Sequence, residues 1–64
     1  MTIIKEGTTK GGKDIRLIND GLKLLDLYSI EEYVKEKTFE GWRRCSDIYN
    51  NKDAALEHFN AMIK

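Results

Sequence analysis

The clearest hydrophobic pattern in the 64-residue chain lies at its C-terminal end, over Asn51 to Ile63. Apolar side chains recur there at the spacing that gathers them on one side of an α-helix, while polar residues fall on the other side. Asn50 or Asn51 can cap the first turn, and Asp53 suits the positive end of the helix dipole. The stretch therefore predicts an amphipathic helix. Its apolar stripe consists of Ala55, Leu56, Phe59, Met62 and Ile63.

Short apolar runs separated by glycine-rich segments precede this helix. Residues 14–17 are Asp-Ile-Arg-Leu, an alternation with the two-residue period of a half-buried strand, and residues 3 and 4 are both isoleucine. Residues 7–13 include three glycines, and Asn19-Asp20-Gly21 places a glycine where a turn needs positive φ. Both segments predict hairpin turns between strands.

The stretch from Leu22 to Phe39 is compatible with two structures. Ser29-Ile30-Glu31-Glu32 has the form of a capping box, which favours a short helix at about residues 30–37. The alternating apolar side chains and the strand-favouring residues of the same stretch indicate instead a long, bent strand from Leu22 to about Lys35, which we favour. Residues Trp42 to Tyr49 also alternate and are predicted to form the last strand, which leads directly into the C-terminal helix.

These elements predict an α+β fold: a small antiparallel β-sheet of three or four strands, in the order ββββα, with one C-terminal amphipathic helix packed on one face. The long strand is expected to pair with Lys13–Asn19 through its first half and with Trp42–Tyr49 through its second. A helix at residues 30–37 would instead give an order such as βββαβα. Because 64 residues hold too little chain for a second core, we expect residues 1–64 to form a single domain.

Composition narrows the class of protein. Eleven Lys and Arg balance eleven Asp and Glu, and this neutrality argues against non-specific binding to nucleic acid, which depends on neutralising phosphates. With 41% hydrophobic and 34% charged residues, the chain is too apolar for a disordered tail and too interrupted for a membrane span. Cys45 is the only cysteine, and the apolar run at Ile3 and Ile4 is too short for a secretory signal. We therefore expect a cytoplasmic protein in a reducing compartment.

Three patterns that suggest catalysis or metal binding have a simpler interpretation. Residues 7–13 match the G-x-x-x-x-G-K core of a phosphate-binding loop, but Asp14 follows where Ser or Thr is needed, so we interpret them as a hairpin loop. Cys45 and His58 supply two soft ligands where structural zinc takes four. We interpret Cys45 as a small half-buried side chain and His58 as a residue at the edge of the helix's apolar stripe, rather than as a catalytic pair. Glu31 and Glu32 are strand neighbours that point to opposite faces, which indicates a solvated strand edge or a bulge. We expect no enzyme, no cofactor and no metal site.

Aromatic and arginine side chains are the best candidates for a binding surface, because Trp, Tyr and Arg are enriched among the residues that dominate interface energies. Strand alternation puts Trp42 and Arg44 on one face and Arg43, Cys45 and Tyr49 on the other. We expect the indole of Trp42 to lie in the core beneath the helix, because burying it contributes most to so small a core. The second set is then left on the uncovered face. If the helix covers the second set instead, Trp42 and Arg44 become the exposed anchors. The partner-binding candidates are Arg43, Arg44, Trp42, Tyr49, Tyr33 and Tyr28.

One helix covers only one face of a sheet, so something else should cover the second face. We therefore expect a non-enzymatic protein-binding module, a stoichiometric inhibitor or adaptor, whose partner is another protein or a second copy of this chain. Its proline-free composition, rich in lysine, isoleucine and asparagine, is typical of small proteins of bacterial phages and mobile elements. The alternative is a small nucleic-acid-binding protein whose aromatic side chains stack on bases. Its phosphate contacts would be Lys10, Lys13, Arg16, Arg43 and Arg44.

Overall fold

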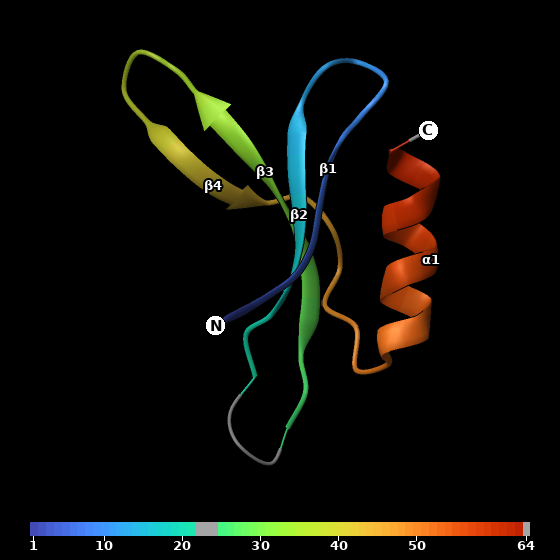
Figure 1. Cartoon of the computed structure of the whole chain (residues 1–64). Coiled ribbons are helices and arrows are strands. Elements are labelled where there is room, and N and C mark those ends of the chain that lie inside the picture. The colour runs from blue at the N-terminus through green and yellow to red at the C-terminus, as the bar shows by residue number, and fades with distance from the viewer. Residues whose placement is uncertain (22–24, 64) are drawn as a thin grey trace.

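A computed structural model of the chain describes residues 1–21 and 25–63, which form four antiparallel strands followed by one helix (Figure 1). The strands are hydrogen-bonded in chain order, β1-β2-β3-β4. The predicted α+β fold in the order ββββα is therefore confirmed. The elements are β1 (Thr2–Thr8), β2 (Asp14–Asn19), β3 (Tyr28–Lys35), β4 (Glu40–Arg44) and α1 (Lys52–Met62).

The glycine-rich segment between β1 and β2 is a hairpin loop, as predicted. The amide of Thr9 donates to the carbonyl of Lys13 at 2.8 Å, and the amide of Gly12 donates to the carbonyl of Thr9 at 2.9 Å. Gly12 has φ of 85°, a conformation that glycine adopts without steric cost. The chain turns back here into a second strand, so the amides do not form the strand-to-helix phosphate cradle that the motif alone suggests.

The connection between β2 and β3 differs from the predicted tight turn. The side chain of Asn19 closes it, because Oδ1 accepts hydrogen bonds from the amides of Gly21 and Leu27. Gly21 is not at positive φ; a Cβ there would instead collide with the carbonyl oxygen of Leu25. The prediction of positive φ was wrong, and close backbone approach is the reason for this glycine.

The central strand β3 begins at Tyr28, so the predicted start at Leu22 was too early; residues 22–24 lie outside the described part of the chain. Its N-terminal half pairs with β2 and its C-terminal half with β4, as predicted. The alternative helix at residues 30–37 is wrong, because neighbours on both sides satisfy this backbone as a strand. No bulge occurs at Glu31–Glu32 in these registers; the irregularity lies in β1, between Ile3 and Lys5.

The last strand is shorter than predicted, ending at Arg44 rather than Tyr49. The chain leaves the ladder where the amide of Cys45 donates to the carbonyl of Ile30 and the hydroxyl of Ser46 accepts the hydrogen bond of the Ile30 amide. It meets β3 again only at an isolated bridge between Tyr28 and Tyr49. A serine side chain thus replaces the backbone of β4 as the partner of β3.

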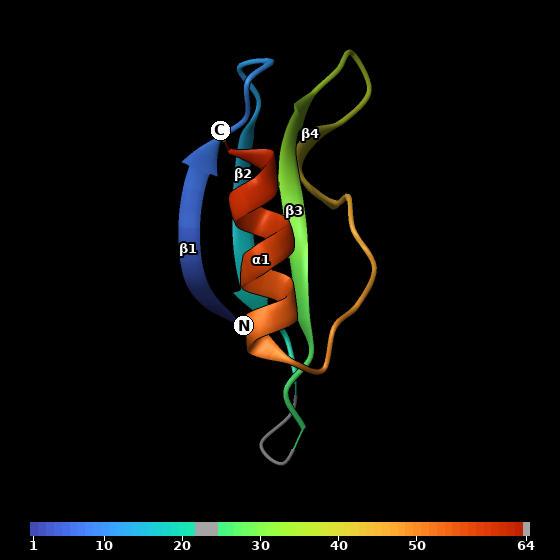
Figure 2. The same ribbon diagram turned by 90° about the vertical axis from the view of Figure 1, so that its right-hand side faces the viewer.

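Helix α1 packs over β2 and β3 and runs roughly along them, with β1 on one side and β4 on the other (Figure 2). Asn51 caps it, as predicted, because its Oδ1 accepts from the amide of Ala54 at 3.1 Å. Phe59 and Ala55 are fully buried, and Leu56, Met62 and Ile63 pack partly buried around them. The predicted apolar stripe is confirmed as the helix side of the core. The buried cluster consists of Ile15, Leu17, Tyr28, Ile30, Ala55 and Phe59.

Candidate functional site

The face of the sheet turned away from α1, which we call the open face, carries the candidate site. Ile15 and Leu17 of β2 and Ile30 of β3 belong to the core beneath α1, so the residues that alternate with them point to the open face. The registers extend this assignment to β1 and β4. The resulting set includes Glu6, Thr8, Asp14, Arg16, Glu31, Tyr33, Trp42 and Arg44, and also Ile3, Lys35, Glu40 and the buried Ile18 and Ser29.

Charged residues form one continuous row across the four strands of the open face. Glu6 of β1 is opposite Arg16 of β2, Arg16 is opposite Glu31 of β3, and Glu31 is opposite Arg44 of β4. The signs alternate along the row, so each charge has an opposite charge as its cross-strand neighbour, an arrangement that stabilises the sheet. The two inner side chains are half-buried, whereas Glu6 and Arg44 at the ends are exposed.

Arg16 is held in place by two contacts at once. Its Nε and terminal nitrogen both lie 2.8 Å from Glu31 Oε1, and these two side chains are only 14% and 18% exposed. Its guanidinium carbon lies 4.2 Å from the ring centre of Trp42, a cation–π contact. The indole therefore leans across β3 towards β2, over a cation whose charge Glu31 already balances.

Tyr33 holds the other side of the indole. The rings of Tyr33 and Trp42 are centred 5.4 Å apart with an angle of 72° between their planes, an edge-to-face arrangement that aromatic pairs favour. The hydroxyl of Tyr33 is hydrogen-bonded to the carboxylate of Glu40, and this bond, followed by burial, raises the pKa of the phenol. Trp42 is thus a half-buried side chain with a fixed orientation, although it lies outside the core.

A pocket of about 360 Å³ adjoins this aromatic cluster at the hairpin end of β1 and β2. Two carboxylates and the indole line it, with Thr8 donating its hydroxyl to Asp14 Oδ1 at 3.2 Å. Glu6 and Asp14 are both exposed. The complete lining is Glu6, Gly7, Thr8, Asp14, Ile15 and Trp42.

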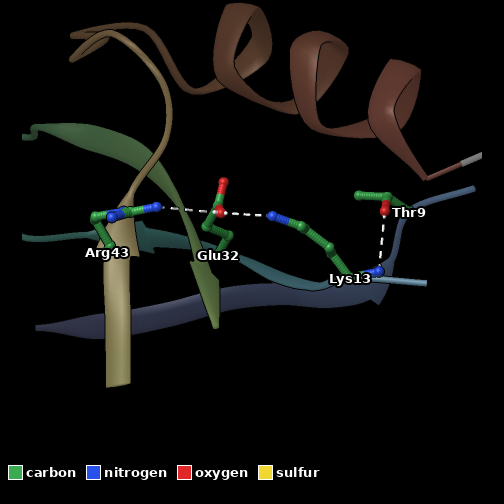
Figure 3. Close-up of polar contacts among 4 residues, drawn as sticks. All are labelled: Thr9, Lys13, Glu32 and Arg43. Carbon is green, nitrogen blue, oxygen red and sulfur yellow. Dashed lines mark hydrogen bonds and ion pairs between the residues drawn. The ribbon is translucent and has the colours of Figure 1, made fainter. Parts of the chain in front are cut away.

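Arg43 lies on the helix side of the sheet, where it belongs to a second group of charges (Figure 3). Glu32 stands between two cations there: its Oε1 lies 3.2 Å from Lys13 Nζ and 3.9 Å from the Arg43 guanidinium. The backbone amide of Lys13 donates to the Thr9 hydroxyl and so ties this group to the hairpin loop. Glu31 and Glu32 do point to opposite faces, as predicted, but each has an ion-pair partner rather than lying at a solvated edge.

The prediction that Trp42 faces the core and Arg43 the uncovered side was wrong. Trp42 is opposite Tyr33 and Arg43 is opposite Glu32, and Glu32 shares its face with the buried Ile30. The assumption behind the prediction was that the largest apolar ring must be buried by the helix. Arg16 and Tyr33 shield the indole instead, on the face without a helix.

Tyr28 and Tyr49 also lie on the helix side and not on the open face. Tyr28 is buried in the core, and Tyr49 packs against the same cluster. The hydroxyl of Tyr49 and Nδ1 of His58 are 2.7 Å apart, so a hydrogen bond to Tyr49 satisfies the histidine at the edge of the apolar stripe of α1.

Of the six candidates, the structure thus brings together Trp42, Tyr33 and Arg44 on the open face. Glu31 was not a binding candidate from the sequence, and Arg16 was one only as a phosphate contact.

Cys45 has the opposite character to an activated nucleophile. Burial raises the pKa of its thiol, and the nearby carboxylate of Glu32 raises it further. The ring of His58 is engaged by Tyr49 rather than by this thiol. Within the described residues no group of three or more His, Cys, Asp and Glu side chains is placed to hold a metal ion, and no helix is long and apolar enough to cross a membrane.

Comparisons of the chain with protein-family models, with curated proteins and with solved structures find no match.

Proposed function

We propose that the protein is a small protein-binding module that docks the open face of its sheet on another protein and acts stoichiometrically, as an inhibitor or adaptor. The observation that supports this most is the cluster of Arg16, Tyr33 and Trp42, assembled on the face that α1 leaves uncovered. Trp, Tyr and Arg are the residue types that dominate binding energies when they occupy the centre of an interface.

The rigidity of this cluster supports the same proposal. Binding normally costs the entropy of ordering flexible side chains, about 0.5–1.5 kcal/mol for each one immobilised. Here the ion pair with Glu31 and the edge-to-face contact with Tyr33 already order Arg16 and Trp42. A partner that covers them therefore gains apolar contact at a reduced entropic cost.

The distribution of basic residues favours a protein partner over nucleic acid. Lys13 and Arg43 lie on the helix side around Glu32, and Arg16 is paired with Glu31. A phosphate backbone laid over the open face would also meet the carboxylates of Glu6 and Asp14. Binding to nucleic acid gains its affinity from phosphate neutralisation, which this arrangement opposes.

Affinity capture with matched variants tests the proposal. The tagged protein is used to recover partners from a lysate of its native host, and recovery is compared for wild type, Arg44→Glu and Arg43→Glu. The two arginines are neighbours, both exposed, and lie on opposite faces, so the two charge reversals differ in the face that they alter. We expect one stoichiometric protein that is recovered by wild type and Arg43→Glu and lost with Arg44→Glu. Equal recovery by all three proteins, or loss with Arg43→Glu alone, would refute docking through the open face.

A further inference from the structure

The charges of the open face are ordered so that this face is complementary to itself. We propose that, when no partner protein is bound, a second copy of the chain covers the open face, related to the first by a two-fold axis that runs parallel to the strands between β2 and β3. This inference goes beyond the proposed function, because it concerns the protein before a partner binds. The dimer and the partner complex use the same face, so a partner must displace the second copy.

The order of the charged row is the first argument. From β1 to β4 the row contains Glu6, Arg16, Glu31 and Arg44, so reading it backwards inverts the sign at every position. The proposed axis lays the row of one copy over the reversed row of the other. Glu6 then faces Arg44 of the second copy, and Arg16 faces Glu31 of the second copy. Every charge of the row therefore meets its opposite across the interface.

The same row excludes the other way of stacking two copies face to face. Packed sheets keep their strand directions within about 30° of each other, so the two-fold axis runs either along the strands or across them. An axis across the strands, along the row, lays β1 over β1 and β4 over β4. Each charge then faces its own equivalent, and opposed like charges weaken an interface. The charge pattern thus selects the axis parallel to the strands.

The two ends of the row have most to gain from a second copy. Glu6 and Arg44 are exposed, and within residues 1–21 and 25–63 neither forms an ion pair. Arg16 and Glu31 already pair at 2.8 Å and are only 14% and 18% exposed, so covering them removes little further water from these charges. Because a two-fold interface repeats each contact, the dimer gains two pairs of Glu6 with Arg44.

Size and shape agree with this alignment. In the row next to the charges, Thr8 is opposite Asp14 and Tyr33 is opposite Trp42. The proposed axis brings the two aromatic rings over Thr8 and Asp14 of the second copy, so large side chains meet small ones. An interface of standard size takes about 800 Å² from each partner, roughly one-sixth of the 4737 Å² that the chain exposes. One broad face of this two-layer fold can provide that area.

Sedimentation equilibrium of the whole chain, up to a concentration of about 1 mM, tests the dimer. We expect a species of twice the 7.4 kDa chain mass, with a dissociation constant in the micromolar range. Glu6→Arg and Arg44→Glu each place like charges at both symmetry-related contacts and should weaken the dimer about tenfold or more. Arg43→Glu is the matched control, because Arg43 is exposed on the helix side, and it should leave the dimer unchanged.

An equimolar mixture of the Glu6→Arg and Arg44→Glu proteins separates the proposed alignment from any other. One protein then carries two arginines at the ends of its row and the other carries two glutamates, so a mixed dimer joins opposite charges at both end contacts. We expect the mixture to dimerise at least as tightly as wild type, although each variant alone does not. Circular dichroism checks that both variants fold. If one does not, Glu6→Gln and Arg44→Gln should still weaken the wild-type dimer.

A wild-type protein that is monomeric at about 1 mM, variants that dimerise as tightly as wild type, or a mixture of folded variants that stays monomeric overturns the inference. Partner capture separates this failure from that of the proposed function. A monomer that still captures a partner through the open face refutes only the dimer, and a dimer that captures no partner refutes only the proposed function.

Discussion

Phe59 is the side chain on which the attachment of α1 to the sheet depends. It is fully buried against Ile15, Leu17 and Ile30, in the cluster that joins the helix to β2 and β3. Truncating a buried phenylalanine to alanine typically costs about 3–5 kcal/mol, the lost transfer energy plus the cavity left behind. At about 0.05–0.15 kcal/mol per residue, the whole chain has roughly 3–10 kcal/mol of stability. Phe59→Ala should therefore remove at least about a third of the stability and as much as all of it.

Urea unfolding measures this loss, followed by far-ultraviolet circular dichroism and by the fluorescence of Trp42, the only tryptophan. The control is Phe39→Ala, since Phe39 is the other phenylalanine and is 44% exposed; this variant should lie within about 0.5 kcal/mol of wild type. If Phe59→Ala does not fold, Phe59→Leu should still fold with reduced stability. A Phe59→Ala protein as stable as Phe39→Ala would refute the packing of α1 on the sheet.

Three further predictions concern the open face, the thiol and the helix cap. Trp42→Ala should stay folded by circular dichroism and lose about 1–2.5 kcal/mol of unfolding free energy in urea, the sum of one aromatic pair and one exposed cation–π contact. Complete unfolding of this variant would show that the indole is part of the core. Alkylation of Cys45 should reach half its maximal rate at a pH above that of an ordinary thiol, because the pKa of the Cys45 thiol is raised. Glu32→Gln should lower this pH only in part, because burial of the thiol remains. A pH profile unchanged by Glu32→Gln would mean that Glu32 does not raise the pKa. Asn51→Ala should cost about 0.5–2 kcal/mol in urea unfolding and Asn51→Gly only a few tenths. An Asn51→Ala protein as stable as wild type would mean that the side-chain cap contributes nothing.

The local elements were predictable because their signals lie within a few residues of each other. The stripe of α1 and its Asn51 cap need only the helical period and one hydrogen-bonding side chain. The β1–β2 hairpin needs only its glycines between alternating runs. Such features depend on the local chain alone, so the sequence determines them without knowledge of the packing.

The face of each strand residue was harder to predict, because alternation gives two faces but does not say which one the helix covers. For β4 the answer depends on the register of Trp42 with Tyr33, two residues joined by pairing and not by sequence proximity. The charges of the strand did not settle it, because Arg44 shares a face with Trp42 while Arg43 lies on the other face. The bulk of the indole decided the prediction.

The start of β3 and the end of β4 were misplaced for a physical reason, whereas the predicted end of β3 at about Lys35 was right. Ser46 satisfies the amide of Ile30 with its hydroxyl, and Asn19 satisfies the amides of Gly21 and Leu27 with its side-chain oxygen. Side chains that replace backbone partners end a strand without any break in the hydrophobic pattern. The alternation over residues 42–49 therefore continues past the point where the ladder ends at Arg44.

Docking through the open face can be observed by mapping the captured partner on the ¹⁵N-labelled protein by NMR. We expect the partner to shift or broaden the indole N–H of Trp42 and the amides of Arg16, Tyr33 and Arg44, and to leave those on the exposed side of α1, such as Glu57, unchanged. Perturbations confined to α1, with the Trp42 indole unaffected, would contradict it.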